Sequence, residues 1–246
     1  MDIATTSDLV NTLAPTGTLR ASINVGNPIL ARTDSAQGAA GVSVDLVHEL
    51  AKKLGVTCKL VIHDAAAQSV EAVTNGQTDV GFFAIDPVRG QELAFTDPYV
   101  LIEGAYLVHN TSPLQDNNQV DQPGHRIMVG QGSAYDLYLS RNIQHAELIR
   151  APTSPRVVEY FLKEGADVAA GVKQQLQVSM ENESGLRLLP GRFMVIRQAM
   201  GVSKKRGAQA HAFVQAFVAH ARDTGLVAQA LERHGISGAS VAQAGD

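Results

Sequence analysis

The residues best suited to bind a charged ligand are an acid and a base three positions apart, Asp86 and Arg89. They follow an apolar run at 79–85 that is bounded by turn residues, as expected for a strand buried on both faces. A guanidinium presents a planar pair of N–H groups that a carboxylate can fill in a bidentate way. On these residues alone, two interpretations stay open. Arg89 is solvated, as is usual for an arginine on a short turn, or it binds a carboxylate, with Asp86 as a competing partner.

A second possible anion site is the segment Gly132-Ser133-Ala134, which lies at a predicted helix start. A helix N-terminus presents unpaired N–H groups and a partial positive charge. Ser133 and Asp136 also match a capping box, in which Ser133 caps its own helix. The two roles are compatible, because Ser133 can cap the helix while its N–H or that of Ala134 meets a ligand.

The sequence carries no signature of catalysis or metal binding. The eight histidines show neither an HExxH motif nor paired spacing, and Cys58 is the only cysteine. GxSxG, P-loop and dinucleotide GxGxxG motifs do not occur. We therefore expect no catalytic residue, no metal and no cofactor.

A first block of alternating strands and helices must position Arg89. Strands are predicted at 19–25, 56–62, 79–85 and 99–109, helices at 43–54 (with Ser43 as N-cap) and 69–74, and loops at 1–15 and 26–41. Helices that alternate with continuous apolar strands favour a parallel sheet with helices on both faces.

A second block follows the polar stretch 111–124 and repeats this order. Strands are predicted at 126–130, 147–150 and 166–171, and helices from Ser133, from Ser154-Pro155 with Ser as N-cap, and over 173–180. An apolar run at 193–200 returns toward the first block. A solvated turn at 204–206 and two terminal helices at 208–221 and 226–235 follow. We predict an α/β fold of two Rossmann-like lobes, 1–106 with 198–246 and 107–197. Two crossing strands join them, and a ligand site and a hinge lie between them.

The composition excludes several classes of protein. Hydrophobic residues make up 45% of the chain and charged residues 18%, so it can bury a full core, and its net charge of −4 argues against nucleic acid as a partner. No stretch approaches the roughly 18–20 apolar residues of a membrane span. The N-terminus, Met1-Asp2-Ile3-Ala4, lacks the basic and apolar regions of a secretory signal, so a cytoplasmic location stays open.

Residues 79–99 read DVGFFAIDPVRGQELAFTDPY. This segment resembles the signature of the family 3 extracellular solute-binding proteins, the amino-acid binders of ABC importers: an apolar strand, a short turn, an Arg and a Phe-Ser/Thr-Asp-Pro-Tyr block. Further landmarks occur in the family's order, namely Gly17-Thr18-Leu19-Arg20, Gly41-Val42-Ser43-Val44-Asp45-Leu46, Gly76-Gln77-Thr78-Asp79, Gln131-Gly132-Ser133 and Gly165-Ala166-Asp167-Val168. The resemblance covers about residues 17–236. It implies a type II periplasmic-binding fold, a periplasmic location and an ABC permease as partner, and we expect a monomer.

The resemblance also implies which residues bind the ligand. Arg89 matches the Arg that pairs with the ligand's carboxylate, and the other candidates are Asn27, Ala84, Ile85, Asp86, Gly132, Ser133, Ala134, Val172 and Lys173.

Several of these positions depart from the family's pattern. Val172 stands where the family has an acid for the ligand's ammonium, no carboxylate occurs from 168 to 180, Ala84 and Ala134 replace hydroxyl residues, and Asn27 replaces an aromatic residue. Burying an ammonium without a carboxylate costs several kcal/mol. Lys173 would repel an ammonium if it faced the cleft, and a solvated helix start is the alternative. The departures favour an anionic or neutral carboxylic metabolite over a zwitterionic amino acid.

Two other functions stay open. One is a ligand-sensing module without a transporter. The other is an enzyme similar to the cyclohexadienyl dehydratases, which share this fold. Their chemistry needs a proton donor near Gln175, and an amide cannot donate and retrieve a proton at neutral pH.

Overall fold

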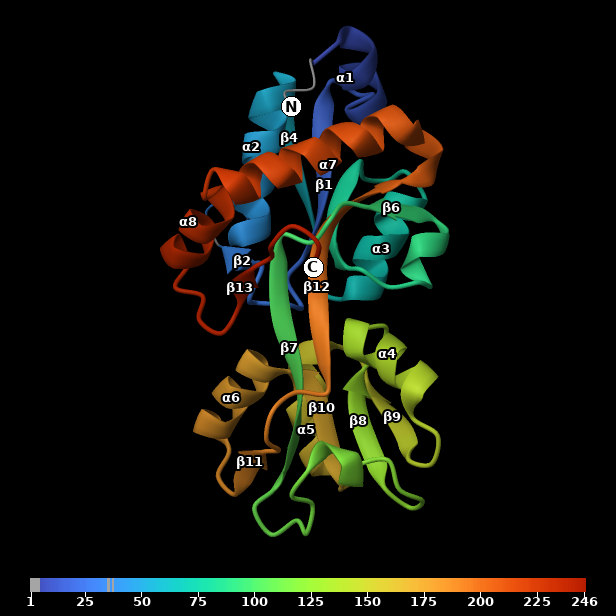
Figure 1. The fold of residues 1–246 in the computed structure, drawn as a ribbon, viewed down its shortest axis with the longest axis vertical. Coiled ribbons are helices and arrows are strands. Elements are labelled where there is room, and N and C mark those ends of the chain that lie inside the picture. The colour runs from blue at the N-terminus through green and yellow to red at the C-terminus, as the bar shows by residue number, and fades with distance from the viewer. Residues whose placement is uncertain (1–4, 35, 37) are drawn as a thin grey trace. The chain divides into compact units, whose positions relative to one another are not determined.

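The computed structural model describes residues 5–34, 36 and 38–246 (Figure 1). The chain divides into two compact units, one that runs up to Leu101 and resumes over Arg197–Asp246, and one formed by Ile102–Ile196. It passes between them within β7 (Val100–His109) and within β12 (Met194–Ser203). The lobe boundaries at 106/107 and 197/198 stay a prediction for the functional lobes. The first change of unit lies earlier in the chain, at 101/102.

The first unit is built on the strand order β4–β1–β5–β12. Its strands are β1 (Thr18–Asn24), β2 (Arg32–Asp34), β3 (Gly38–Ala40), β4 (Thr57–His63), β5 (Val80–Ala84), β6 (Leu93–Phe95) and β13 (Ser240–Val241). Strand β1 runs parallel to β4 and β5, and β12 runs antiparallel to β5 and β6. Strands β2 and β3 form a separate hairpin, and β13 pairs with the start of β7.

The helices of the first unit are α1 (Ser7–Leu13), α2 (Val42–Leu54), α3 (Ala66–Thr74), α7 (Gly207–Asp223) and α8 (Leu226–Arg233), with short 3₁₀ helices η1 (Arg89–Gln91) and η4 (Lys204–Arg206). Of these, α2 and α3 pack on the parallel strands. The connections β1–α2–β4 and β4–α3–β5 run in opposite directions along the sheet. Because such crossovers are right-handed, α2 and α3 cover opposite faces.

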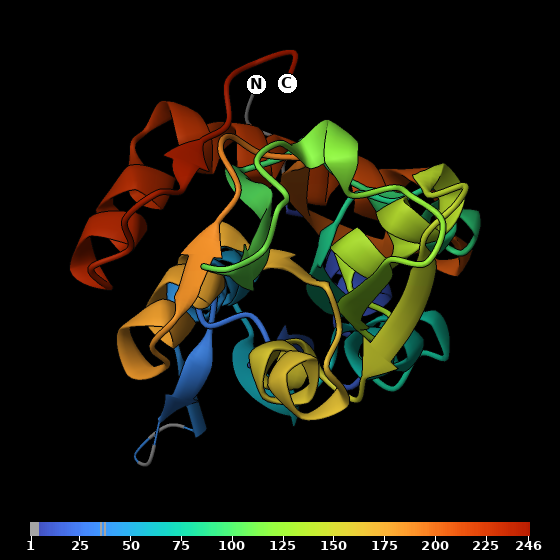
Figure 2. The same ribbon diagram turned by 90° about the horizontal axis from the view of Figure 1, so that it is seen from below.

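The second unit has the strand order β7–β10–β8–β9. Its further elements are η2 (Asn117–Gln119), β8 (Arg126–Gly130), α4 (Ala134–Asn142), β9 (Glu147–Ala151), η3 (Ser154–Arg156), α5 (Val157–Glu164), β10 (Val168–Val172), α6 (Lys173–Asn182) and β11 (Leu186–Leu188). Strand β8 is parallel to β9 and β10, whereas β7 is antiparallel to β10 and β11. Helix α5 packs on β8, β9 and β10 and is seen end-on in Figure 2.

The two units share one topology and one hydrogen-bond pattern. In the first unit, the Asp79 carboxylate accepts the Arg20 N–H at 2.7 Å, and the Asp79 N–H donates to the Arg20 carbonyl at 2.7 Å. In the second, Asp167 and Arg126 make the same two bonds at 2.8 and 3.0 Å. Each aspartate precedes the third parallel strand and ties it to the start of the first.

Residues 1–15 were predicted as a loop, and this is wrong for α1. The Thr6 hydroxyl caps the helix by accepting the Leu9 N–H at 3.3 Å. Leu9 and Leu13, four residues apart, are both buried, and α1 packs on α7. The packing of these two leucines holds a short helix whose other residues, apart from Val10, are polar.

The predicted N-caps Ser43 and Ser154 are also wrong. Helix α2 begins after Gly41, whose φ is 141° and where a Cβ would lie 2.4 Å from the Leu30 carbonyl oxygen. Ser43 is therefore buried inside the helix. Ser154 is the first residue of η3, with Thr153 at its N-cap, and α5 starts only at Val157.

Two predicted loops contain regular or buried structure. The segment 26–41 holds the β2–β3 hairpin. The turn 204–206 is η4, and its Arg206 side chain is not solvated but pairs with the fully buried Asp79 carboxylate, which Arg20 also contacts. Among the residues that the structure describes, no helix has the length and apolar character needed to cross a membrane.

Candidate functional site

The turn after β5 is shaped by Asp86. The Asp86 carboxylate accepts the Val88 N–H at 2.8 Å, and its carbonyl accepts the Gly90 N–H at 2.8 Å. These bonds bend the chain into η1 directly after the strand. The turn buries Asp86 and Arg89 and leaves Ile85 40% exposed.

Arg89 is a buried cation. The residue is 7% exposed, and its Nη1 donates to the Ala84 carbonyl at 3.2 Å. Burial lowers the pKa of Arg89 to about 10, and the negative charge of Asp86 opposes this change. Arg89 therefore stays protonated at neutral pH, in a place where a charge is costly unless groups of opposite sign surround it.

Asn27 lies in the turn that follows β1, the parallel neighbour of β5. Its carbonyl accepts the N–H groups of Leu30 and Ala31 at 3.0 and 3.1 Å. Its side-chain Oδ1 is buried and has no hydrogen-bond partner among the described residues. Parallel strands bring their carboxyl ends to one sheet edge, so Asn27 and the Asp86–Arg89 turn follow the same edge of the first unit.

In the second unit, Ser133 caps α4 as predicted. Its Oγ accepts the Asp136 N–H at 3.0 Å. The Asp136 carboxylate, however, accepts the Gly132 N–H at 2.8 Å instead of the Ser133 N–H, which donates to the Gly130 carbonyl at 3.0 Å. Within the described residues, the Ala134 N–H has no such partner, and it is the backbone donor of this trio left for a ligand.

Asp136 places a resident negative charge at the start of α4. Arg150 pairs with it at 3.0 Å, and the Asp136 side chain is only 6% exposed. Because Arg150 balances this charge, Asp136 does not prevent an anion from binding near Ala134.

The carboxyl end of β10 carries a cluster of three charges. Every residue of β10 is buried, including Val172, and Lys173 begins α6. Lys173 Nζ lies 2.8 Å from one Glu103 carboxylate oxygen, and Arg192 Nη1 lies 2.8 Å from the other. The hydrogen bonds from Lys173 and Arg192 lower the pKa of Glu103 below its ordinary value, so it is ionised at neutral pH.

The sheet register brings the two predicted groups of the second unit to one edge. Strands β8 and β10 are parallel, with Ile127 opposite Val168 and Met128 opposite Ala169. The chain leaves β8 into α4 and leaves β10 into α6. The starts of both helices therefore lie at the same edge of the sheet, where α/β sheets ordinarily bind ligands. Arg89 and Asn27 belong to the first unit.

Sequence reasoning missed two polar residues at this edge. Glu103 interrupts the apolar run of β7, and an acid inside such a run was the available signal. Gln174, beside Lys173, is 9% exposed, and its Oε1 has no hydrogen-bond partner in the described part of the chain. No sequence pattern distinguishes Gln174 from the glutamines around it.

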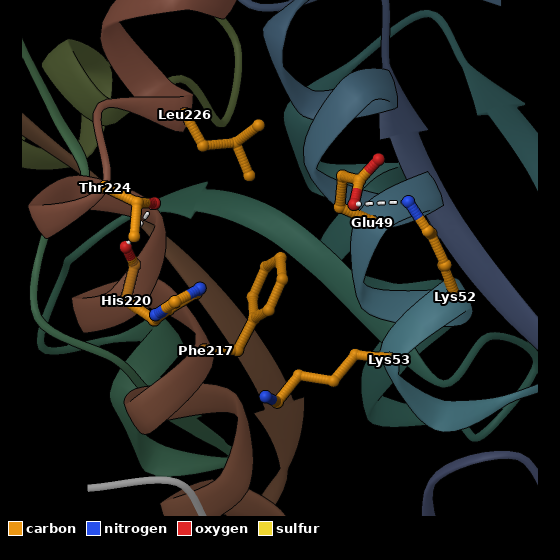
Figure 3. A pocket seen from close by; sticks show the side chains of 7 residues that line it. All are labelled: Glu49, Lys52, Lys53, Phe217, His220, Thr224 and Leu226. Atoms are coloured by element: carbon orange, nitrogen blue, oxygen red, sulfur yellow. Dashed lines mark hydrogen bonds and ion pairs between the residues drawn. The ribbon is translucent and has the colours of Figure 1, made fainter.

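A hollow elsewhere on the first unit contains none of the predicted site residues. Figure 3 shows it among α2, α7 and the start of α8, lined by Glu49, Lys52, Lys53, Phe217, His220, Thr224 and Leu226. Lys52 Nζ lies 3.7 Å from a Glu49 carboxylate oxygen, and both side chains are largely exposed. We assign no ligand to this hollow.

Solved structures with the same fold include binding proteins and a sensor. A solute receptor for L-cysteine of Neisseria gonorrhoeae is 20% identical, with 92% of each chain covered and a TM-score of 0.78. A histidine kinase sensor domain with similarity to periplasmic binding proteins is 18% identical, covering 92% of this chain and 98% of that one, with a TM-score of 0.77. The ancestral amino-acid-binding protein AncCDT-1, a precursor of cyclohexadienyl dehydratase, is 17% identical, covering 91% and 97%, with a TM-score of 0.76. At these identities the likeness shows the fold alone, and it confirms the predicted α/β fold of the type II periplasmic binding proteins.

The sequence comparisons give the family. No curated protein matches the chain. The model of the bacterial extracellular solute-binding proteins, family 3, matches residues 19–236, which is most of the chain and close to the span of the resemblance seen in the motifs. The chain therefore belongs to the family 3 bacterial extracellular solute-binding proteins.

Proposed function

We propose that this protein is the solute-binding component of an ABC importer and that it holds a small carboxylate-bearing metabolite. The observation that carries the proposal is the buried, protonated guanidinium of Arg89 at the carboxyl end of β5. Membership of a family of extracellular solute-binding proteins supports the binding role.

The groups that we propose for the ligand's carboxylate are Arg89 in the first unit and the start of α4 in the second unit. Arg89 supplies a fork of N–H donors, and the Ala134 N–H together with the Ser133 hydroxyl supplies neutral donors at a helix N-terminus. Asn27, Ala84, Ile85, Asp86, Gly132, Val172 and Lys173 complete the proposed site.

The proposed partner is an ABC permease and the proposed location is the periplasm, in line with the extracellular character of the family. We propose that the protein works as a monomer, because all the candidate site residues come from one chain.

A thermal-shift screen of organic acids and amino acids tests the carboxylate proposal. A ligand present at 100 times its dissociation constant stabilises a protein by about 2.7 kcal/mol, which such a screen detects. We expect carboxylates to raise the melting temperature and the corresponding primary amides to leave it unchanged. Equal shifts with acid and amide, or no shift with any compound, would overturn it.

A ligand-sensing module is the second candidate, because a histidine kinase sensor domain shares the fold. Ligand-dependent stimulation of a permease's ATPase by the purified protein distinguishes the two functions, since a sensor without a transporter gives none. A dehydratase is disfavoured, because the chain carries Gln175 where a proton donor would be needed. Turnover of prephenate or arogenate would contradict the non-enzymatic proposal.

A further inference from the structure

The start of α6, directly after the buried strand β10, carries positive charge that no group in the helix balances. Val172 is the N-cap and offers no side-chain hydrogen bond to the first turn, which contains no acidic residue. The partial positive charge of this helix end is therefore not balanced from within the helix. Lys173, the first helical residue, adds a full positive charge.

Glu103 holds Lys173 in place without cancelling the local charge. Its two carboxylate oxygens take Lys173 and Arg192, each at 2.8 Å, so two cations share one anion. The cluster thus keeps a net charge of +1. A lysine ammonium has three N–H donors, and the hydrogen bond to Glu103 uses one of them. The Lys173 side chain is 31% exposed and therefore within reach of a solute.

Building on the proposed function, we infer that Lys173, oriented by Glu103, binds a second acidic group of the ligand, so that the protein selects a dicarboxylate lacking an α-ammonium group. Lys173 and Ala134 begin helices at the same edge of the second unit's sheet. A small ligand whose first carboxylate meets the start of α4 thus lies near the positive cluster. There a second carboxylate gains a charge-assisted hydrogen bond, whereas an ammonium is repelled.

Two matched series of ligands separate these effects by isothermal titration calorimetry. The five-carbon series is pentanoate, glutarate, L-norvaline and L-glutamate, and the four-carbon series is butyrate, succinate, L-2-aminobutyrate and L-aspartate. Within each series the second carboxylate and the α-ammonium vary independently. In the series of fitting length, we expect the dicarboxylate to bind at least about tenfold tighter than the monocarboxylate and tighter than its amino counterpart.

Two variants test whether Lys173 causes the preference for the dicarboxylate. Lys173→Met should reduce the preference for the dicarboxylate over the monocarboxylate to about twofold or less. Lys163→Met, which removes an exposed lysine of α5 in the same unit, should leave the preference unchanged. Circular dichroism and thermal melting establish whether each variant is folded. If a variant does not fold, the affinities of the wild-type protein for the two ligand series still test the inference.

Equal affinity for mono- and dicarboxylates would overturn the inference. So would tighter binding of the amino members with loss of that preference in Glu103→Gln, or an unchanged preference for the dicarboxylate in folded Lys173→Met. If all eight compounds fail to bind while the wider screen finds another carboxylate, the inference fails and the proposed function stands. If no carboxylate binds at all, both fail.

Discussion

At the scale of single residues, Arg89 is the buried cation of the proposed site. An arginine residue that is 7% exposed has lost most of its hydration, and burial lowers its pKa to about 10. Asp86 lies nearby and opposes the shift, yet its carboxylate also accepts the Val88 N–H that shapes the turn. An incoming carboxylate would therefore add stabilisation to a charge that the protein has already desolvated.

Replacing Arg89 tests this energy directly. We expect Arg89→Ala to weaken the binding of a carboxylate ligand found in the screen by about 2–5 kcal/mol, because the anion would lose its partner in a desolvated site. Arg89→Lys should recover little of the loss, since an ammonium cannot reproduce the bidentate fork. Calorimetric titration measures both, with Lys59→Ala as a control that removes an exposed cation of β4. Wild-type affinity in both Arg89 variants would remove this residue from the site.

The pH dependence of stability tests the Glu103 cluster. The folded-state pKa of Glu103 lies below its ordinary value of 4.5. Its contribution to stability is therefore fully present above pH 4.5 and is lost as the pH falls toward the lower folded-state pKa. Urea denaturation of wild type and Glu103→Gln over this interval should show a smaller loss of stability in the variant. Parallel curves would mean that the ion pairs add nothing, as is common for partly exposed pairs.

At the scale of elements, the short helix α1 depends on two buried side chains. Leu9 and Leu13 are at most 1% exposed, and the Arg206 guanidinium donates to the Thr12 carbonyl near the end of the helix. Seven residues are too few for a stable isolated helix in water, so packing on α7 must stabilise α1.

Truncating Leu13 should destabilise the protein. We expect Leu13→Ala to lower the free energy of unfolding by about 2–5 kcal/mol, the range for removing a fully buried leucine side chain. Chemical denaturation measures this value, and Asn11→Ala, at an exposed position of the same helix, is the control with an expected change near zero. Equal effects of the two variants would show that α1 contributes no packing energy.

At the scale of the whole molecule, the shared topology of the two units leads to unequal versions of one hydrogen-bond pattern. Asp79 is fully buried and pairs with both Arg20 and Arg206. Asp167 is exposed, and its carboxylate accepts the Arg126 N–H. The same pair of Asp–Arg hydrogen bonds thus includes a buried, doubly ion-paired carboxylate in the first unit and an exposed carboxylate in the second.

This difference predicts unequal effects of the matched substitutions. Asp79→Asn should destabilise the protein by about 3–5 kcal/mol, because two arginines would lose a buried anionic partner. Asp167→Asn should cost about 1 kcal/mol or less, since water screens an exposed group. Equilibrium denaturation of both variants gives the comparison, and equal costs would contradict the assignment of the difference to burial.

Sequence periodicity was sufficient for the longer strands and the long helices, but it did not identify the strands of two or three residues. Continuous apolar runs, such as the one that became β5, identify buried strands because both faces of a parallel sheet exclude water. The motif around Arg89 and the landmarks from 17 to 236 were specific enough to identify the family. The helix start at Ser133 was also readable, because capping depends on residues within one turn.

Contacts between distant segments decided what the sequence left open. The N-cap of α2 is Gly41 and not Ser43, and Gly41 lies so close to the Leu30 carbonyl that a side chain there would clash. Arg206 lies in a run of basic residues that was predicted to be a solvated turn, yet it forms an ion pair with Asp79, which is distant in the sequence. Glu103 lies on β7 and Lys173 begins α6, and no local pattern predicts their ion pair. Helix and strand propensities depend on neighbouring residues and can therefore be predicted from the sequence. The partner of a charged side chain depends on strand order and register, which only the packed sheet establishes.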